Sequence, residues 1–170
     1  MIDFRPRRTL LYLPASNGRA IEKARGLPAD VLILDLEDAV APDAKADARA
    51  AAVAAAAGGF GAREVGIRVN GFGTPWCAAD FAEVARSAAG FVVVPKIAGA
   101  DEAAEAVARA GGKPVLAMVE TPRAVQRVDS IADMAGVAGL VAGFADLQKD
   151  LRARPGPGRT SLLYLSLIHI

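Results

Sequence analysis

The stretch Val31-Leu-Ile-Leu-Asp-Leu-Glu-Asp-Ala-Val40 decides the fold. Its first half is an unbroken apolar run rich in branched side chains, which is typical of a strand buried on both faces of a parallel sheet. Its second half is acidic, because Asp35, Glu37 and Asp38 crowd the point where the strand must leave the core. Carboxylates this close repel one another unless a cation, an arginine or solvent compensates them. We therefore interpret the acidic half as a candidate functional site; alternatively, Asp38 or Asp43 simply caps the next helix.

The composition excludes several classes of protein. The 170 residues carry a formal net charge of +1 with both signs interspersed, so nothing indicates nucleic acid or an anionic membrane as a partner. No apolar run reaches the roughly 18 residues of a membrane span, and the start lacks the order of a secretion signal. We therefore expect a soluble cytoplasmic protein. Cys77 is the single cysteine, which excludes an internal disulfide and a cysteine-clustered metal site.

Strands and helices alternate along the chain. Apolar runs bounded by glycine, proline or polar residues predict strands, which are followed by segments with helical periodicity and capping residues. The expected strands cover residues 9–13, 31–35, 64–69, 90–95, 114–119 and 139–142. The expected helices begin after Asn17, at 43, 74, 101 and 122, the last running to about 135, with a helical turn that reaches Leu151. Six such units require a parallel sheet flanked by helices.

The polar residues at the strand ends favour one of two architectures. They are Asp35, Glu37, Arg68, Lys96, Glu120 and Asp146. An open doubly wound sheet uses chiefly the strand ends beside one switch point, whereas all strand ends of a barrel face one mouth. The pattern therefore predicts a TIM-type (β/α) barrel. Since a complete barrel has eight units in about 250 residues, we expect an incomplete barrel with six units, forming a partial (β/α) barrel domain over residues 1–165.

The last residues do not continue the pattern. The sequence Leu165-Ser-Leu-Ile-His-Ile170 coincides with one reading frame of a transposon-derived adapter used in preparing DNA sequencing libraries. We expect residues 166–170 to be a non-native tail; the alternative is a genuine apolar tail. If the tail is not native, the single histidine, His169, is not native either, which excludes histidine triads and zinc sites. An unclosed barrel exposes strand edges, so we expect the chain as it stands to be poorly soluble and inactive.

Four of the strand-end residues have side chains suited to binding a metal ion or a substrate carboxylate. Glu120 and Asp146 each leave a strand in a tight turn, and two carboxylates completed by water and substrate oxygens are how proteins usually hold magnesium. Arg68 offers a planar fork that can bind a substrate carboxylate at two points. Lys96 adds positive charge. The alternatives are that Glu120 caps the helix after Thr121 and that Lys96 only extends its ammonium into solvent.

Six motifs in the expected order resemble the HpcH/HpaI aldolase and citrate lyase beta-subunit family, which includes citryl-, malyl- and citramalyl-CoA lyases. The resemblance runs from about residue 7 to about residue 165. The motifs are Leu11-Tyr-Leu-Pro-Ala-Ser-Asn17, Asp35-Leu-Glu-Asp-Ala-Val-Ala-Pro42, Arg68-Val-Asn70, Val94-Pro-Lys96, Glu120-Thr-Pro122 and Gly143-Phe-Ala-Asp-Leu147.

The resemblance implies a TIM-type barrel, often a trimer or hexamer, that uses magnesium to cleave or form a carbon–carbon bond next to a CoA thioester. It implies that Glu120 and Asp146 bind the metal and that Arg68 contacts substrate. Glu37 and Asp38 match acidic residues that hold waters and substrate, and either one is a candidate catalytic base, directly or through water.

We therefore predict a magnesium-dependent lyase that cleaves a citryl-, malyl- or citramalyl-CoA type of 3-hydroxyacyl-CoA into an acyl-CoA and a keto acid by retro-Claisen chemistry. Arg68, Lys96 and Glu120 are its expected substrate-binding residues. The turn Ser16-Asn17-Gly18 with Arg19 or Lys23 either holds a CoA phosphate or is a plain helix cap. Two other functions stay open: a CoA-independent, metal-dependent pyruvate aldolase for 2-keto-3-hydroxy acids, and a non-catalytic binding relative.

Overall fold

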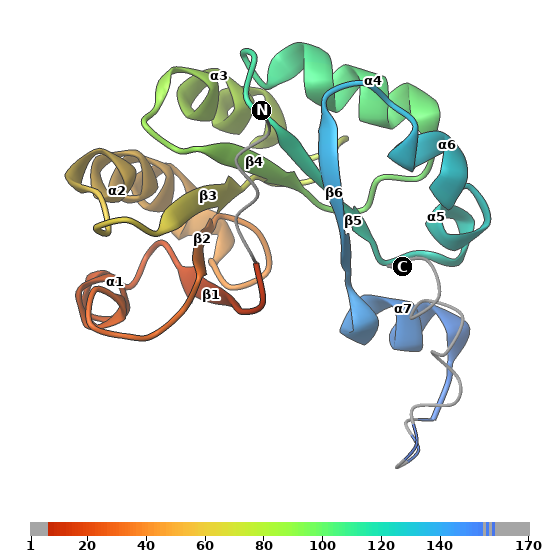
Figure 1. The fold of residues 1–170 in the computed structure, drawn as a ribbon, viewed down its shortest axis with the longest axis horizontal. Helices are drawn as coiled ribbons and strands as arrows, with labels where there is room; N and C mark the ends of the chain where they lie inside the picture. Colours follow the sequence, from red (N-terminus) through yellow and green to blue (C-terminus); the bar gives the residue numbers. More distant parts are fainter. Residues whose placement is uncertain (1–6, 155, 157, 159–170) are drawn as a thin grey trace. The chain divides into compact units, whose positions relative to one another are not determined.

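The computed structural model describes residues 7–154, 156 and 158. The chain divides into two compact units, Met1–Val93 and Val94–Ile170, whose elements are labelled in Figure 1. The described residues contain six strands, and helices follow the strands along the chain in both units, which confirms the predicted β/α alternation. The residues expected to form the tail, 166–170, lie outside the described part of the chain.

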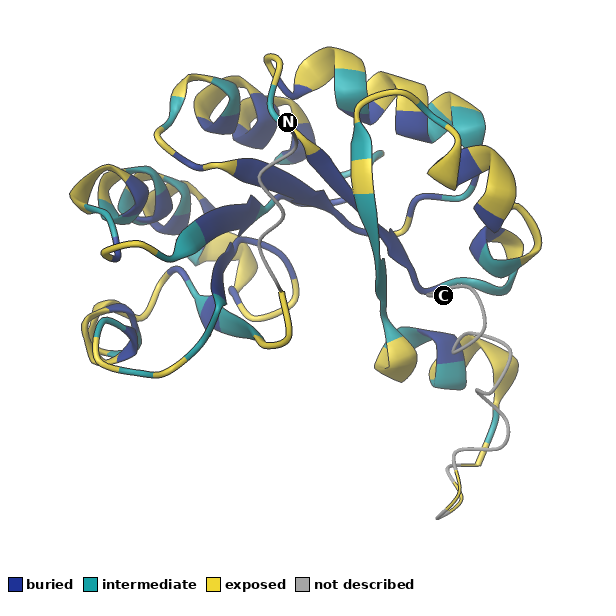
Figure 2. Cartoon of the chain, viewed as in Figure 1, coloured by how far each residue is buried: buried dark blue, intermediate teal, exposed yellow. Residues whose placement is uncertain are grey.

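The first unit is a parallel sheet with helices between its strands. Its elements are β1 (Leu10–Pro14), α1 (Gly18–Ala24), β2 (Val31–Asp35), the 3-10 helix η1 (Pro42–Ala44), α2 (Lys45–Gly58), β3 (Glu64–Arg68), α3 (Cys77–Arg86) and β4 (Phe91–Val94), whose last residue begins the second unit. β2 lies between β1 and β3, and all five of its residues are buried, as Figure 2 shows. The strand predicted from its apolar run is therefore confirmed.

The register of the first unit aligns its strand ends. Pro14 of β1 pairs with Asp35 of β2, and Asp35 pairs with Arg68 of β3. The β3–β4 register depends on Gly66, where a β-carbon would lie 2.0 Å from the Phe91 ring. Because the strands are parallel, their carboxyl ends meet at one edge. This edge brings the acidic end of β2 beside the basic end of β3.

The second unit has a shorter sheet. Its elements are α4 (Ala100–Arg109), β5 (Val115–Val119), α5 (Pro122–Gln126), α6 (Val128–Ala132), β6 (Val137–Ala142) and α7 (Phe144–Leu151). β5 and β6 are parallel, with a register shift between Val115 and Leu116. All of β5 is buried, whereas β6 is mostly half-buried, a contrast visible in Figure 2.

The single helix expected from residue 122 to about 135 is wrong, because the structure has two short helices there. Arg127 separates α5 from α6 with a non-helical φ of −122° and ψ of 16°. No glycine or proline marks this break in the sequence, so helical periodicity alone did not reveal it. The Arg127 side chain lies over Gly99, where a β-carbon would come within 3.3 Å of its guanidinium. β6 also begins two residues earlier than expected.

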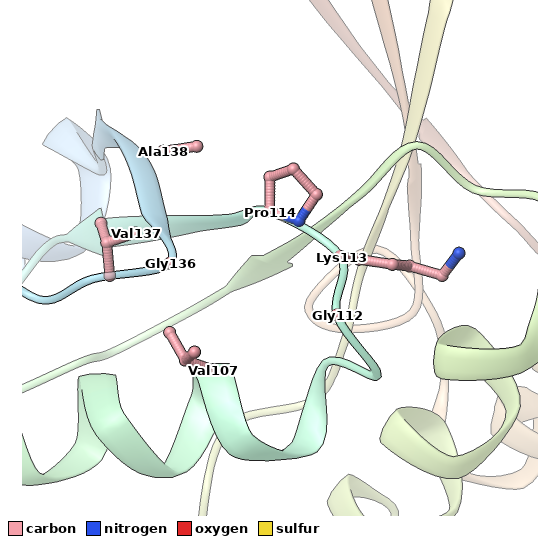
Figure 3. Close-up of a pocket in the computed structure, with 7 residues that line it drawn as sticks. All are labelled: Val107, Gly112, Lys113, Pro114, Gly136, Val137 and Ala138. Carbon is pink, nitrogen blue, oxygen red and sulfur yellow. The ribbon is translucent and has the colours of Figure 1, made fainter.

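A pocket of about 470 Å³ opens at the amino ends of β5 and β6, as Figure 3 shows. It is lined by Val107, Gly112, Lys113, Pro114, Gly136, Val137 and Ala138. The Lys113 side chain extends away from Val137 and Ala138 in this view. Ligands of parallel α/β folds bind at the carboxyl ends of strands, so this pocket is at the wrong end of the sheet for the predicted chemistry.

The described part of the chain has no helix that combines the length and the apolar composition needed to cross a membrane.

Asp30, just before β2, gives the stability of the first unit a pH dependence. Its carboxylate accepts hydrogen bonds from the Arg8 side chain at 2.8 Å and from the backbone N–H groups of Arg8 and Thr9. The hydrogen bond from Arg8 lowers the pKa of Asp30 from 3.8 to about 2. Because the folded-state pKa is the lower one, the contribution is fully present above pH 3.8 and is lost as the pH falls toward 2.

We expect the urea midpoint of the chain to fall between pH 5 and pH 2.5, with part of this fall removed in Asp30→Asn, which cannot titrate. Unfolding curves recorded at half-unit pH steps for both chains measure the difference. An identical acid dependence in the two chains would contradict the role given to Asp30. Asp150→Asn, at an exposed position of α7, is the matched control and should retain the full acid dependence.

Candidate functional site

The carboxyl edge of the first unit carries a cluster of Asp35, Glu37 and Arg68, which we call the Arg68 cluster. The Arg68 guanidinium donates from Nε to Asp35 Oδ1 at 2.7 Å and from Nη2 to Asp35 Oδ2 at 2.6 Å. Its Nη1 lies 3.0 Å from Glu37 Oε2. The Asp35 and Glu37 carboxylates are buried, and Arg68 is 11% exposed. The arginine that the sequence assigned to substrate is thus also the cation that compensates the acidic stretch.

Asp35 also shapes the loop that follows β2. Its Oδ1 accepts a hydrogen bond from the backbone N–H of Glu37 at 2.9 Å, and its Oδ2 accepts one from Ala39 at 3.2 Å. Asp38 is exposed on this loop. The helix-cap alternative for Asp38 or Asp43 is wrong, because the residues at the cap positions of η1 and α2 are alanines without a side-chain cap bond.

The Arg68 guanidinium stays charged in this setting. Burial by itself lowers its pKa, but the hydrogen bond to Asp35 and the charges of Asp35 and Glu37 outweigh burial and raise the pKa above its ordinary value. The guanidinium also lies over the Tyr12 ring of β1, 5.3 Å from the ring centre, which is within the range of a cation–π contact. The cluster therefore presents a permanently charged, well-held guanidinium.

Lys45 anchors the same edge, and sequence reasoning missed it. The ammonium of this buried residue donates to the carbonyl oxygens of Leu36 and Glu37 at 2.6 and 2.7 Å and to Asn70 Oδ1 at 2.7 Å. Burial lowers its pKa, against the charges of Asp35 and other carboxylates, which raise it. Lysine at the first position of a helix gives no sequence signal for burial. The Lys45 ammonium ties the loop after β2 to the loop after β3.

The buried carboxylate of Asp80 extends the Lys45 network through Asn70. Asp80 of α3 accepts from the backbone N–H of Asn70 at 2.9 Å, from Asn70 Nδ2 at 2.6 Å and from Arg49 Nε at 2.6 Å. Every contact of this network lies in the first unit. The segment that carries Arg68 is therefore held from two helices, α2 and α3.

Replacing Lys45 by methionine should destabilise the chain by about 2–4 kcal/mol, because three buried acceptors lose a charged donor while the volume is kept. Urea unfolding monitored by Trp76 fluorescence measures the loss, since the Lys45 ammonium lies 5.2 Å from the ring of this single tryptophan. Lys23→Met, at an exposed position of α1, is the control, with an expected change within about 0.5 kcal/mol. Equal effects of the two changes would show that Lys45 is not an anchor.

The second unit brings together Lys96, Glu120 and Asp146, which we call the Glu120 cluster. Glu120 directly follows β5 and is 2% exposed. Its Oε1 accepts a hydrogen bond from the backbone N–H of Lys96 at 2.7 Å. The Lys96 ammonium lies 3.8 Å from Asp146 Oδ2, with both side chains partly exposed. Lys96 therefore contacts both predicted metal ligands.

Local structure explains why these two carboxylates are held where they are. Thr121 caps α5 by accepting the N–H of Ala124 at 3.1 Å, so the alternative that Glu120 caps this helix is wrong. Gly143 follows β6, and a β-carbon there would lie 2.4 Å from Glu120 Cβ and Oε2. Asp146 stands in the first turn of α7, where the helix dipole favours a negative charge.

The Glu120 cluster fits the donor preferences of magnesium. Both predicted ligands are hard carboxylate oxygens, one buried and one partly exposed. In the described part of the chain, no group of three or more histidine, cysteine or acidic side chains is placed to hold a metal. Magnesium is commonly bound by one or two carboxylates with waters and substrate oxygens, and the cluster supplies that number.

The turn before α1 forms the helix cap that was one of the two alternatives for this segment, the other being a CoA-phosphate site. Asn17 Oδ1 accepts the N–H of Ala20 at 3.0 Å. Arg19 and Lys23 are exposed on this seven-residue helix, and Lys23 stands in its last turn.

Known proteins match almost the whole chain. The HpcH/HpaI aldolase/citrate lyase family matches residues 8–167. A (3S)-malyl-CoA thioesterase of Cereibacter sphaeroides (strain KD131 / KCTC 12085) is 39% identical over 158 residues, which are 92% of this chain and 55% of that protein. An L-malyl-CoA/beta-methylmalyl-CoA lyase of Cereibacter sphaeroides (strain ATCC 17029 / ATH 2.4.9) is 34% identical over 142 residues, 75% of this chain and 45% of that protein.

Solved structures agree with this match. The protein CitE from Mycobacterium tuberculosis, in complex with magnesium, acetoacetate and coenzyme A, is similar with a TM-score of 0.79 and 28% identity over 96% of this chain and 63% of that one. Such neighbours are TIM-barrel-like, which confirms the expected TIM-type α/β class. The chain spans about half the length of the curated relatives described above. With its motifs, fold and matches in agreement, the chain belongs to the HpcH/HpaI aldolase/citrate lyase family.

Proposed function

We propose that the protein is a magnesium-dependent carbon–carbon lyase that cleaves a malyl-, citryl- or citramalyl-CoA type of thioester into an acyl-CoA and a keto acid. The observation that carries this proposal is the Glu120 cluster, in which a buried and a partly exposed carboxylate are joined by Lys96. Its support from relatives is that a CitE structure holds magnesium, acetoacetate and coenzyme A and that a 34% identical protein is a malyl-CoA lyase.

In this mechanism Glu120 and Asp146 would hold magnesium, which would supply Lewis acidity that stabilises negative charge developing on substrate oxygen. Arg68 stays charged and neutralises the substrate carboxylate. Since its guanidinium already binds Asp35 at two points, the substrate must share these donors or exchange places with a protein carboxylate. Glu37 or Asp38 takes the hydroxyl proton, directly or through water, as the carbon–carbon bond breaks and its electron pair moves into the thioester enolate. Protonation of the enolate carbon then gives the acyl-CoA and balances the proton removed from the hydroxyl.

Thioester hydrolysis is the second candidate function, because a 39% identical relative is a malyl-CoA thioesterase. Both reactions start from the same substrate, but they break different bonds. Cleavage of malyl-CoA by a lyase yields acetyl-CoA and glyoxylate. Hydrolysis yields malate and the free thiol of CoA. Product analysis therefore separates the two functions.

The test incubates (3S)-malyl-CoA with magnesium and either the 170-residue chain or the whole protein that its gene encodes. Glyoxylate is trapped as its phenylhydrazone, and free thiol is measured with a disulfide reagent. Lyase function predicts glyoxylate and acetyl-CoA in equal amounts, lost on chelation of magnesium, from the whole protein. Thiol without glyoxylate would establish the hydrolase instead. Turnover only of free 2-keto-3-hydroxy acids would favour the aldolase, and no turnover of any of these substrates by the whole protein would overturn the proposal.

A further inference from the structure

Lys96 has a backbone conformation that its residue type does not favour. Its φ is +56°, and Arg152 is the other non-glycine residue with a positive φ in the part of the chain that the structure describes. A left-handed conformation is costly for a side chain with a β-carbon and persists where the surroundings enforce it. Here the enforced conformation accompanies the hydrogen bond from the Lys96 N–H to Glu120 Oε1 at 2.7 Å. The strain therefore coincides with the positioning of the buried carboxylate.

Glu120 is confined from a second direction by Gly143. The space that a β-carbon at Gly143 would fill is taken by Glu120, whose Cβ and Oε2 would both lie 2.4 Å away. Gly143 itself has a negative φ of −91°, so alanine suits its backbone and only the contact with Glu120 forbids it. The Lys96 amide and the Gly143 backbone together hold the Glu120 carboxylate in one place.

The Lys96 side chain contacts Asp146, the second predicted metal ligand. Its ammonium lies 3.8 Å from Asp146 Oδ2, and the two side chains are 45% and 32% exposed. An ammonium at this distance compensates the Asp146 carboxylate when no metal is bound. A divalent cation at the same carboxylate meets the ammonium as a like charge. The two cations therefore oppose each other at Asp146.

We propose that Lys96 is a positioning residue with two separable effects on the cation site: its backbone amide orients Glu120 for a divalent cation, and its ammonium competes with that cation at Asp146. This inference rests on the proposed function, since it takes Glu120 and Asp146 as the metal ligands. The competition holds cation affinity below what the two carboxylates would otherwise provide. It also keeps Asp146 compensated between binding events.

The test is a calorimetric titration of the 170-residue chain with Mn²⁺ alone, which measures the affinity for the cation. Lys96→Gly keeps the amide, suits the positive φ and removes the ammonium, so its affinity should rise about fivefold at low ionic strength. The gain should shrink in 0.5 M salt, because screening weakens the repulsion between the two cations. Lys96→Arg keeps the charge and should stay within about twofold of the unchanged chain. Lys96→Asn, which also tolerates the left-handed conformation, repeats the test if the glycine variant does not fold.

Gly143→Ala tests the orientation of Glu120 in the same assay. It should weaken Mn²⁺ binding by about tenfold or more while the far-ultraviolet circular dichroism is unchanged. Equal or weaker binding by Lys96→Gly and Lys96→Asn would overturn the competition, and unchanged binding by Gly143→Ala would overturn the orientation. If the unchanged chain binds Mn²⁺ and Glu120→Gln does not, the metal site is supported independently of the results for the Lys96 variants. If no variant binds, the metal site and the inference both fail.

Discussion

Replacing Arg68 by methionine is expected to destabilise the chain by about 3–5 kcal/mol. The change leaves the Asp35 and Glu37 carboxylates buried without the guanidinium that lies 2.6 to 3.0 Å from them. The loss of stability comes from leaving desolvated carboxylates without a countercharge. The intact ion pair itself contributes little net stability, because both partners also lost hydration on folding. Urea unfolding at pH 8 measures the effect.

Two further variants separate this explanation from lost packing. In Arg68→Met combined with Asp35→Asn, one of the uncompensated charges is gone, so the double variant should be less destabilised than the sum of the single changes. Arg86→Met is the control, because Arg86 is exposed and pairs with Glu83 within the same helix. Its expected change is within about 0.5 kcal/mol. A similar loss from Arg68→Met and Arg86→Met would refute the account of the cluster.

Replacing Glu120 by glutamine is expected to weaken the binding of Mg²⁺ or Mn²⁺ by about 100-fold, or about 2.7 kcal/mol. The amide keeps an oxygen that can accept the Lys96 N–H, so the local structure should persist. It removes the negative charge that strengthens the attraction of this ligand for a hard divalent cation. Calorimetric titration of the 170-residue chain with Mn²⁺ measures the loss, and magnesium competition extends the result to the ion of the proposed function.

Glu105→Gln is the matched control in the same unit. Glu105 is an exposed glutamate of α4 that pairs with Arg109 one turn away, and its replacement removes the same charge at a position away from any strand end. Cation affinity should then stay within about twofold of the unchanged chain. Equal losses in the two variants would indicate diffuse attraction by net charge. Retained binding in Glu120→Gln would remove Glu120 from the ligand set.

Much of the fold followed from local sequence pattern. The run that begins at Val31 was predicted as a buried strand, and the structure has β2 with every residue buried. The helix starts at Asn17 and Thr121 were also predicted from residue type, and both side chains make the cap bond. Periodicity and capping are properties of neighbouring residues, so they can be read without knowing any distant contact. The break at Arg127 had no such local sign.

The contact partners of the functional residues could not be predicted from local sequence pattern. The sequence by itself determined that Asp35, Arg68, Lys96 and Glu120 stand at strand ends, because strand period and chain reversal are local. Only the tertiary structure decided that Arg68 binds Asp35, since this depends on the parallel register that aligns the ends of β2 and β3. It likewise decided that Lys45 is buried and that the Lys96 amide holds Glu120. Such pairings depend on which segments pack together, and that choice is made by the whole chain.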